Sequence, residues 1–201
     1  MTDKLTSRQR VLAALNHQVP DRVPIDLGGF QTGIHRKAYE SLLGHLGLTE
    51  DIVILDPVQQ LAKPSETVLR RFQVDTRYLC AKGPEGFDGR IRQNRRNGRL
   101  WHDLTDEFGV VWSMPDDQPL YMDISHHPLA DATIEDVRRY PFPRGNDPTR
   151  FSGLRAVAQQ LQSSGYAVCT GIGGVVYEYG WYLRGLEQWF MDMIENPAFC
   201  E

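Results

Sequence analysis

Short apolar runs typical of β-strands alternate along this chain with segments of helical spacing. The runs lie at Val23–Leu27, Val74–Cys80 and Tyr166–Thr170, and each is followed within three residues by glycine. Helical spacing occupies the stretches between and after them, at about residues 7–16, 34–46, 64–72, 147–165 and 176–195. Strands that alternate with helices are typical of βαβ units. We therefore predict an α/β fold built on a largely parallel sheet.

Local signals mark several of the helix ends. Thr6 and Gln9 have the spacing of a capping box, in which each side chain satisfies a free backbone donor of the other. Asp147-Pro148 opens the clearest helix, because apolar residues then recur at steps of three and four until Gly165. Residues 99–114 lack such regularity, and their aromatic residues around a glycine predict a small hairpin inserted near 85–125.

The C-terminal residues indicate how much of the domain we expect in this chain. Asn196-Pro197 is a helix-start signature, yet the sequence ends at Glu201, barely one turn later. A single isolated turn is costly to nucleate. We therefore expect residues 1–201 to form the N-terminal portion of one (β/α)8 TIM-barrel domain, which usually needs about 250 residues. A frayed natural terminus is the alternative.

Composition excludes several classes of protein. The net charge of −4 disfavours a general nucleic-acid binder, which is usually basic. No apolar stretch approaches the roughly 18 to 20 residues that cross a bilayer, so no membrane association is expected. The cysteines are three in number and far apart, which argues against a disulfide framework. These features predict a protein of the reducing cytoplasm.

The ends of the predicted strands supply the candidate site residues. Parallel α/β folds place their sites where strands end and loops begin. The residues selected in this way are Asp26, Gly28 and Gly29 after the first run, Asp75 and Arg77 beside the second, and Gly171, Gly173, Gly174, Tyr177 and Glu178 after the third. The last glycines match neither a dinucleotide fingerprint nor a P-loop, and a tight turn is the favoured interpretation.

Each of two groups of charged residues in the central part of the chain allows two interpretations. Asp75 and Arg77 are two residues apart in a predicted strand and so share a face, where they would pair with each other or with a substrate. The arginines of residues 90–99 could attract a polycarboxylate or phosphate, although a solvated face is favoured. No spacing of histidine and cysteine gives a metal site, and no G-x-S-x-G elbow is present.

Several motifs resemble a known family. The chain opens with Ser7 to His17 (SRQRVLAALNH) and Pro20 to Pro24 (PDRVP), which closely resemble the start of proteins in the uroporphyrinogen decarboxylase superfamily. Later stretches are also similar to this group, at residues 71–77, 106–112, 128–131, 171–174 and 183–185. The resemblance spans essentially the whole chain. It implies a (β/α)8 barrel of which residues 1–201 supply the first half.

The superfamily includes uroporphyrinogen decarboxylases and methyltransferases that take a methyl group from a corrinoid protein. The decarboxylases resemble one another in an arginine-bearing loop after the first strand, but the matching residues 27–33 contain no arginine. Their catalytic Ser-Asp pair is matched by Tyr78-Leu79-Cys80, and a later tyrosine by Trp181. A porphyrinogen with many carboxylates needs guanidinium partners. The departures therefore favour the methyltransferase branch.

The strand-end residues selected above are expected to take the following roles. Asp75, Arg77 and Glu178 would be catalytic, and Asp26, Tyr177 and the glycines at 28, 29, 171, 173 and 174 would bind substrate. Zinc, held by residues beyond this chain, would present a thiolate to a methyl-corrinoid partner protein, and a homodimer is allowed. Two alternatives remain, a decarboxylase of uroporphyrinogen or a related tetrapyrrole, and a non-catalytic binding subunit.

Overall fold

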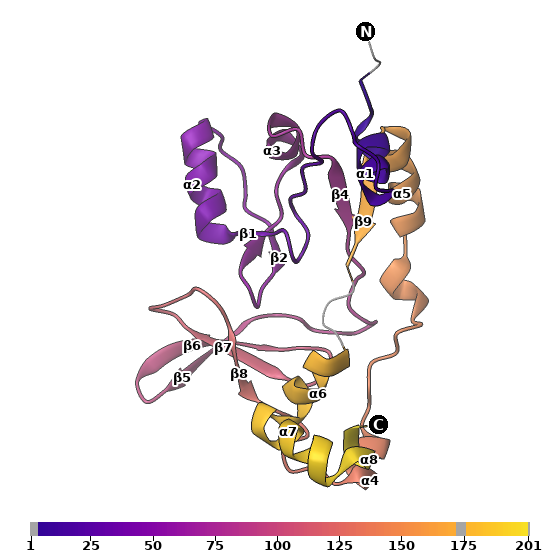
Figure 1. Ribbon diagram of the computed structural model, residues 1–201. Helices are drawn as coiled ribbons and strands as arrows, with labels where there is room; N and C mark the ends of the chain where they lie inside the picture. The colour runs from indigo at the N-terminus through magenta and orange to yellow at the C-terminus, as the bar shows by residue number, and fades with distance from the viewer. Residues whose placement is uncertain (1–3, 172–175, 201) are drawn as a thin grey trace. The chain divides into compact units, whose positions relative to one another are not determined.

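The computed structural model describes residues 4–171 and 176–200, which form two compact units of mixed helix and strand (Figure 1). The first unit comprises Met1–Lys82 and Phe151–Gly171, and the second comprises Gly83–Arg150 and Ile172–Glu201. The fold is therefore mixed α/β. The strands that the structure describes form three separate sheets, none of which closes into a barrel.

A parallel strand pair lies at the centre of the first unit. β4 (Thr76–Leu79) pairs with β9 (Ala167–Thr170) in parallel register, with the first residues of the two strands opposite each other. The helices α1 (Ser7–Leu15) and α5 (Leu154–Ser163) pack against both strands (Figure 1). Within the described residues every other strand pair is antiparallel, so the expectation of a largely parallel sheet is met by this pair alone.

The rest of the first unit contains a small antiparallel sheet and two helices. Its elements are β1 (Ile34–His35), α2 (Arg36–Leu46), β2 (Ile54–Asp56), β3 (Leu61–Ala62) and α3 (Glu66–Arg71), and the strand order is β1-β3-β2. Tyr39, Leu43, Ala62 and Val68 form its hydrophobic core.

The second unit is built on a four-stranded antiparallel sheet. Its strands are β5 (Arg92–Arg96), β6 (Arg99–Thr105), β7 (Val111–Pro115) and β8 (Asp123–His126), paired in sequence order. The hairpin expected near 99–114 corresponds to β6 and β7, and a further strand lies on each side of it.

The helices of the second unit follow this sheet. They are α4 (Ile134–Arg139), α6 (Val176–Arg184), α7 (Leu186–Glu195) and α8 (Pro197–Cys200). Val110, Leu129 and Leu183 form a core with aromatic residues around them. None of the helices described in either unit has the length and apolar character needed to span a membrane.

The predicted strand at residues 23–27 is wrong. This segment has no strand pairing, although the Asp75 backbone N–H donates to the Ile25 carbonyl oxygen at 2.8 Å. One local feature and one distant contact explain the difference. Pro24 has no N–H to give to a ladder, and the Ile25 N–H donates to the Asp75 side chain at 2.8 Å.

Two helices predicted as continuous are interrupted at glycines. The helix expected over 147–165 is a 3-10 turn, Pro148–Phe151, followed by α5, and Gly153 between them has φ 82°. The helix expected over 176–195 is divided at Gly185, which has φ 90°. Positive φ is incompatible with a right-handed helix. Apolar periodicity alone does not reveal such breaks.

The C-terminus of α2 has the glycine stop that the sequence predicts. Gly47 lies in the left-handed region at φ 66°, and its N–H donates to the Gly44 carbonyl oxygen at 3.2 Å. An added Cβ would meet nothing within 4 Å at either glycine. Only backbone conformation therefore distinguishes the two positions.

These two glycines should respond in opposite directions to alanine. Gly47→Ala should lower the free energy of unfolding by about 1–2 kcal/mol, because an L-residue is strained in the left-handed region. Gly44→Ala should raise it by about 0.5–1 kcal/mol, because alanine is the better helix former. Urea unfolding of both variants measures the difference. Equal effects would contradict the capping assignment.

Candidate functional site

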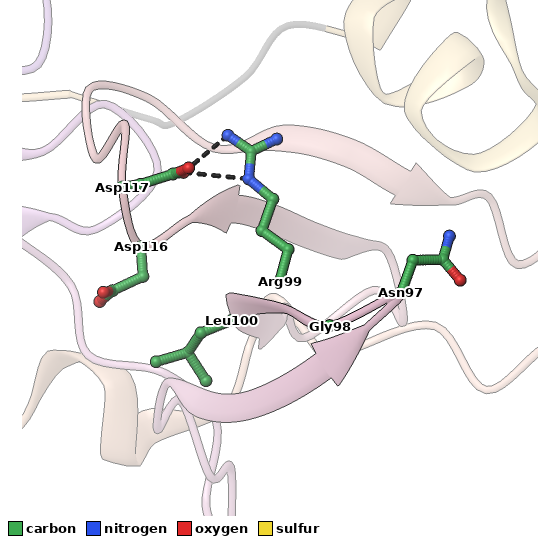
Figure 2. Close-up of a pocket in the computed structure, with 6 residues that line it drawn as sticks. All are labelled: Asn97, Gly98, Arg99, Leu100, Asp116 and Asp117. Atoms are coloured by element: carbon green, nitrogen blue, oxygen red, sulfur yellow. Dashed lines mark hydrogen bonds and ion pairs between the residues drawn. The ribbon is translucent and has the colours of Figure 1, made fainter.

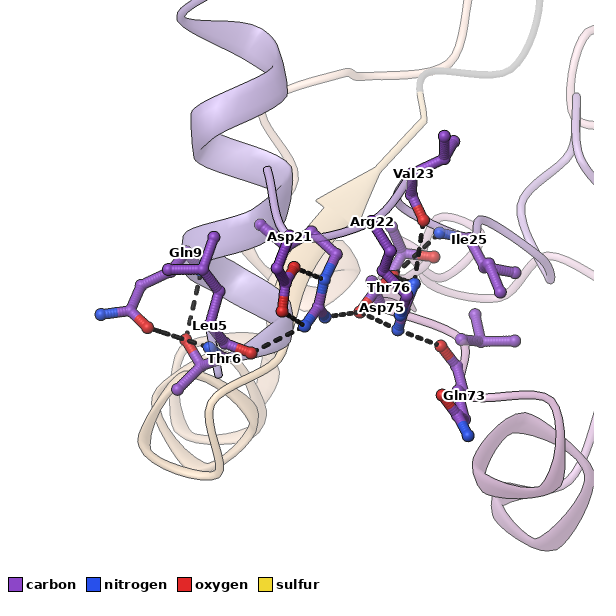
Figure 3. Close-up of polar contacts among 12 residues, drawn as sticks. Leu5, Thr6, Gln9, Asp21, Arg22, Val23, Ile25, Gln73, Asp75 and Thr76 are labelled. Carbon is purple, nitrogen blue, oxygen red and sulfur yellow. Dashed lines mark hydrogen bonds and ion pairs between the residues drawn. The ribbon is translucent and has the colours of Figure 1, made fainter. Parts of the chain in front are cut away.

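A buried carboxylate lies at the start of β4 (Figure 3). Asp75 is 0% exposed, and its Oδ1 accepts a hydrogen bond from Arg10 Nη1 at 2.6 Å. Its Oδ2 accepts from Arg22 Nη1 at 2.7 Å and from the Ile25 N–H at 2.8 Å. Burial alone would raise the pKa of Asp75, but the hydrogen bonds, led by that from Arg22, lower it overall. Asp75 is therefore an ionised anchor.

Arg10 and Arg22 connect this anchor to the N-terminal segment. Arg10 is 3% exposed and also binds Asp21 with two hydrogen bonds, of 2.6 and 2.8 Å, and the Leu5 carbonyl oxygen at 2.7 Å. The hydrogen bond from Arg10 is the main cause that lowers the pKa of Asp21 to about 2. Arg22 donates to the Gln73 carbonyl oxygen at 3.0 Å. We call Arg10, Asp21, Arg22 and Asp75 the Asp75 network.

Arg77 forms a different ion pair. Its guanidinium binds Glu66 with hydrogen bonds of 2.8 and 2.9 Å and lies 3.8 Å from the ring centroid of Tyr166. The hydrogen bond from Arg77 is the main cause that lowers the pKa of Glu66 to about 2. The expected pair of Asp75 with Arg77 is thus replaced by two separate pairs, because Arg10 and Arg22 reach Asp75 from a distant segment. Each ion pair therefore links β4 or the residue directly before it to another element, Asp75 to α1 and Arg77 to α3.

Asp26 lies against the strand pair, beside a different set of residues. Its carboxylate accepts hydrogen bonds from Thr76 Oγ1 at 2.5 Å and from the Tyr78 hydroxyl at 2.8 Å. Thr76 and Tyr78 alternate along β4 and so share one face. Cys169 is directly opposite Tyr78 in β9. Asp26, Thr76, Tyr78 and Cys169 form what we call the Asp26 cluster.

The hydroxyl and thiol of this cluster are held in their neutral forms. Burial and then the Asp26 carboxylate raise the pKa of Tyr78, although a hydrogen bond with Thr32 acts in the opposite direction. The same two causes raise the pKa of the Cys169 thiol. Reactive cysteines have a lowered pKa. The cluster is therefore suited to hydrogen bonding and not to thiolate attack.

The glycine turn predicted as a binding loop abuts the cluster. Gly28 has φ 103°, and its N–H donates to the Thr32 carbonyl oxygen at 3.1 Å. A Cβ added to Gly29 would lie only 2.4 Å from Tyr78 Cζ. The absence of a side chain at Gly29 is thus what allows the loop backbone to approach the phenol ring.

Gly171 lies on the other side of the same loop. A Cβ on Gly171 would be 3.5 Å from Phe30 Cδ2 and 3.9 Å from Gln31 Oε1. Three predicted substrate-binding residues therefore lie against the strand pair or directly after it: Asp26, Gly29 and Gly171. Gly28 lies beside Pro64 instead. Parallel α/β folds place their sites where such strands end.

Of the remaining predicted site residues, the structure describes two, Tyr177 and Glu178. Gly173 and Gly174 lie outside the residues that the structure describes. Tyr177 and Glu178 belong to α6 in the second unit. The Tyr177 ring packs edge-on against Trp189, with the ring centroids 6.5 Å apart.

Sequence reasoning missed several members of both sets. Thr76 and Tyr78 carried a usable signal, because two polar side chains at a spacing of two in a buried strand point to one polar face. Cys169 had no local signal, since its position depends on the register between β4 and β9. Arg10 and Arg22 were identified only as members of the motifs at residues 7–17 and 20–24. Nothing in those motifs indicates that the two arginines contact Asp75.

Four of the five arginines of residues 90–99 pair with nearby carboxylates, and Arg95 donates to the Gly98 carbonyl oxygen at 3.3 Å. Arg99 pairs with Asp117 at 2.6 Å beside a half-open cavity of about 520 Å³ (Figure 2). Other pairs on this hairpin are Arg90 and Arg92 with Asp88, and Arg96 with Asp103. A surface that already supplies its own carboxylates favours the solvated-face interpretation over a polyanion site.

Among residues 4–171 and 176–200 no group of three or more His, Cys, Asp or Glu side chains could hold a metal ion. The described residues therefore do not fit a zinc centre. Comparison of the chain with protein-family models, with curated proteins and with solved structures finds no match.

Removing the charge of Asp75 should destabilise the fold strongly. Asp75→Asn leaves two guanidinium groups without their shared anion, and breaking a buried pair costs about 3–5 kcal/mol. Asp51→Asn, at an exposed aspartate of the same unit, is the matched control and should stay within about 0.5 kcal/mol of wild type. Denaturant unfolding distinguishes them, and similar losses in both variants would refute the anchoring role.

The same network should make stability depend on acid pH. The pKa of Asp21 is lowered to about 2 and that of Asp75 is also lowered, so the folded state binds protons less readily than the unfolded state. Their stabilisation should be complete above the ordinary carboxyl pKa of about 4 and should be lost as pH falls toward about 2. Asp21→Asn should flatten this decline in unfolding free energy, whereas Asp51→Asn should not. If the unfolding free energies of wild type, Asp21→Asn and Asp51→Asn fall in parallel as the pH is lowered, the prediction is wrong.

Proposed function

We propose that this chain is part of a methyltransferase-like member of the uroporphyrinogen decarboxylase superfamily and supplies the N-terminal part of a (β/α)8 barrel. One observation carries the proposal. The residues of the Asp75 network come from three separate motifs of the resemblance, at residues 7–17, 20–24 and 71–77, yet they form one buried set of contacts. A chance likeness of three short motifs gives no reason for their side chains to meet.

The Asp26 cluster is the proposed ligand-binding edge. Asp26 offers a carboxylate acceptor, and Tyr78 offers a hydroxyl that stays protonated at neutral pH. The glycines at 28, 29 and 171 let the backbone lie close to Pro64, Tyr78 and Phe30, and in this proposal the edge of a tetrapyrrole or corrinoid contacts the outer rim of this packed set. In this proposal Asp26 and Tyr78 bind and orient the ligand.

Asp75 and Arg77 take a positioning role in this proposal. Their charged atoms are occupied by partners within the fold, and both side chains are at least 95% buried. Ile25, whose N–H is bonded to Asp75, directly precedes Asp26 in the chain. Asp75 therefore acts on the ligand edge by fixing the backbone from which Asp26 extends.

Methyl transfer is favoured over decarboxylation by the state of the arginines. Binding a tetrapyrrole with many carboxylates needs guanidinium groups that are free to pair with it. Arg22 and Arg77 are engaged with Asp75 and Glu66, and the loop of residues 27–33 has no arginine. In this proposal the described residues bind and orient the ligand.

Methyl transfer can be tested directly with the full-length protein that contains these residues. Methylcobalamin and 2-mercaptoethanol serve as probes under anaerobic conditions, and cob(I)alamin formation is followed by absorbance. Tyr78→Phe removes the hydrogen bond to Asp26 and should lower kcat/KM by about tenfold or more. Tyr121→Phe, at an exposed tyrosine of the second unit, should leave it unchanged.

The alternatives give different results in the same preparation. Consumption of uroporphyrinogen without methyl transfer would replace the proposal with a decarboxylase. Binding of methylcobalamin without turnover would indicate a non-catalytic binding subunit. Turnover that is indifferent to Tyr78→Phe would remove the Asp26 cluster from the ligand edge.

A further inference from the structure

The hairpin of β5 and β6 turns through Asn97 and Gly98 at its tip (Figure 2). Arg96 and Arg99 are paired on the two sides of this turn. Asn97 has φ 51° and Gly98 has φ 79°. Central residues with positive φ are typical of a type I′ turn, in which Asn followed by Gly is the preferred sequence. The geometry of the hairpin thus accounts for this pair of residues, and it also joins two groups that can react with each other.

The reactive groups are the Asn97 carboxamide and the backbone nitrogen of Gly98. An asparagine side chain can be attacked at Cγ by the nitrogen of the next residue, because the attack closes a small, unstrained imide ring. Glycine favours this attack, since it has no side chain to crowd the nitrogen. Of the asparagines in the sequence, only Asn97 is followed by glycine.

The fold leaves both groups accessible. Asn97 and Gly98 are exposed. Within residues 4–171 and 176–200, neither the Asn97 side chain nor the Gly98 N–H has a hydrogen-bond partner. A Cβ added to Gly98 would meet nothing within 4 Å, and β5 is an edge strand of its sheet. The turn can therefore open for ring closure without displacing packed atoms.

Asn94 of the same hairpin provides an internal comparison. It is exposed like Asn97, but it lies within β5, directly opposite Trp101 in β6. Its Nδ2 donates to Asp103 Oδ2 at 3.4 Å. The residue after it is Arg95, whose side chain crowds the nitrogen that would attack. The strand and the sequence thus both protect Asn94.

The charge at the tip of the hairpin favours an acidic product. Arg95 Nη1 donates to the Gly98 carbonyl oxygen at 3.3 Å, so its guanidinium lies at the turn. In the part of the chain that the structure describes, the other four arginines of residues 90–99 pair with carboxylates and Arg95 does not. A carboxylate at position 97 would lie beside this cation, which favours its ionised form.

We propose that Asn97-Gly98 is a site of spontaneous covalent modification, at which the asparagine becomes a carboxylate that pairs with Arg95. The Gly98 nitrogen loses its proton to hydroxide and bonds to Asn97 Cγ. The bond from Cγ to Nδ2 breaks, and Nδ2 takes a proton from water and leaves as ammonia, which regenerates the hydroxide. No atom is oxidised or reduced.

Water then opens the imide ring in one of two ways. Attack at Cγ restores the ordinary backbone as an aspartyl residue. Attack at the main-chain carbonyl carbon gives an isoaspartyl residue, whose backbone is longer by one carbon. The two-residue turn cannot keep its register with this extra atom, so the pairing of Arg96 with Arg99 is lost in the isoaspartyl product.

The reaction can be followed in the chain during incubation at mildly alkaline pH in water enriched in heavy oxygen. Chymotrypsin releases residues 88–100 as one peptide, and its fragment ions report Asn94 and Asn97 separately. Asn97 should convert about tenfold faster than Asn94 or more, should incorporate solvent oxygen, and should react faster as the pH rises. Equal rates at the two asparagines would overturn the proposal.

Two glycine variants test the attacking nitrogen. Gly98→Ala should slow the conversion of Asn97 about tenfold, because the methyl group crowds the nitrogen. Gly86→Ala is the matched control, since Gly86 has φ 77° and a Cβ there would also meet nothing within 4 Å. It should leave the rate unchanged. A rate that is the same in Gly98→Ala and in wild type would refute attack by this nitrogen.

Pairing of the product with Arg95 is tested separately. In Asn97→Asp the new carboxyl should titrate, by NMR, at a lower pH than in the double variant that also carries Arg95→Gln, because the neighbouring cation stabilises the ionised form. Identical titrations in the two proteins would exclude Arg95 as the partner.

Discussion

The buried carboxylate of Asp75 is the interaction on which the first unit depends. An isolated ionised carboxylate at 0% exposure would be very unfavourable. Two guanidinium groups and one backbone N–H satisfy it, so its burial becomes a constraint on where those groups lie. Since Arg10 is on α1 and Arg22 follows it, the constraint fixes the whole N-terminal segment against the start of β4.

This constraint extends to the candidate site through a single residue. The Ile25 N–H is bonded to Asp75, and Asp26 follows immediately with its carboxylate between Thr76 and Tyr78. Charge is concentrated in the buried network, while the neighbouring cluster has a neutral hydroxyl and a neutral thiol. The unit thus separates the groups that hold the fold from those suited to contact a ligand.

Features governed by local chemistry could be predicted from the sequence, and those governed by distant contacts could not. The capping box of Thr6 and Gln9 and the stop at Gly47 depend only on residues within one or two turns, and both are present. The break at Gly153 results from a positive φ angle, which the spacing of apolar residues does not predict. At the site, Asp26 and three glycines were identified as strand-end residues. The contact between Arg10 and Asp75 spans 65 positions, and no pattern of either segment specifies it.

The packing of α1 against β9 has a consequence for the order in which the protein is made. The Arg8 N–H donates to the Gly165 carbonyl oxygen at 2.8 Å, so the first helix is completed by a residue near the far end of the unit. On a ribosome that adds about 5–20 residues per second, α1 waits on the order of ten seconds for this partner. Until then the N-terminal end of α1 lacks this backbone contact, whereas Asp75, the partner of Arg10, is made much earlier.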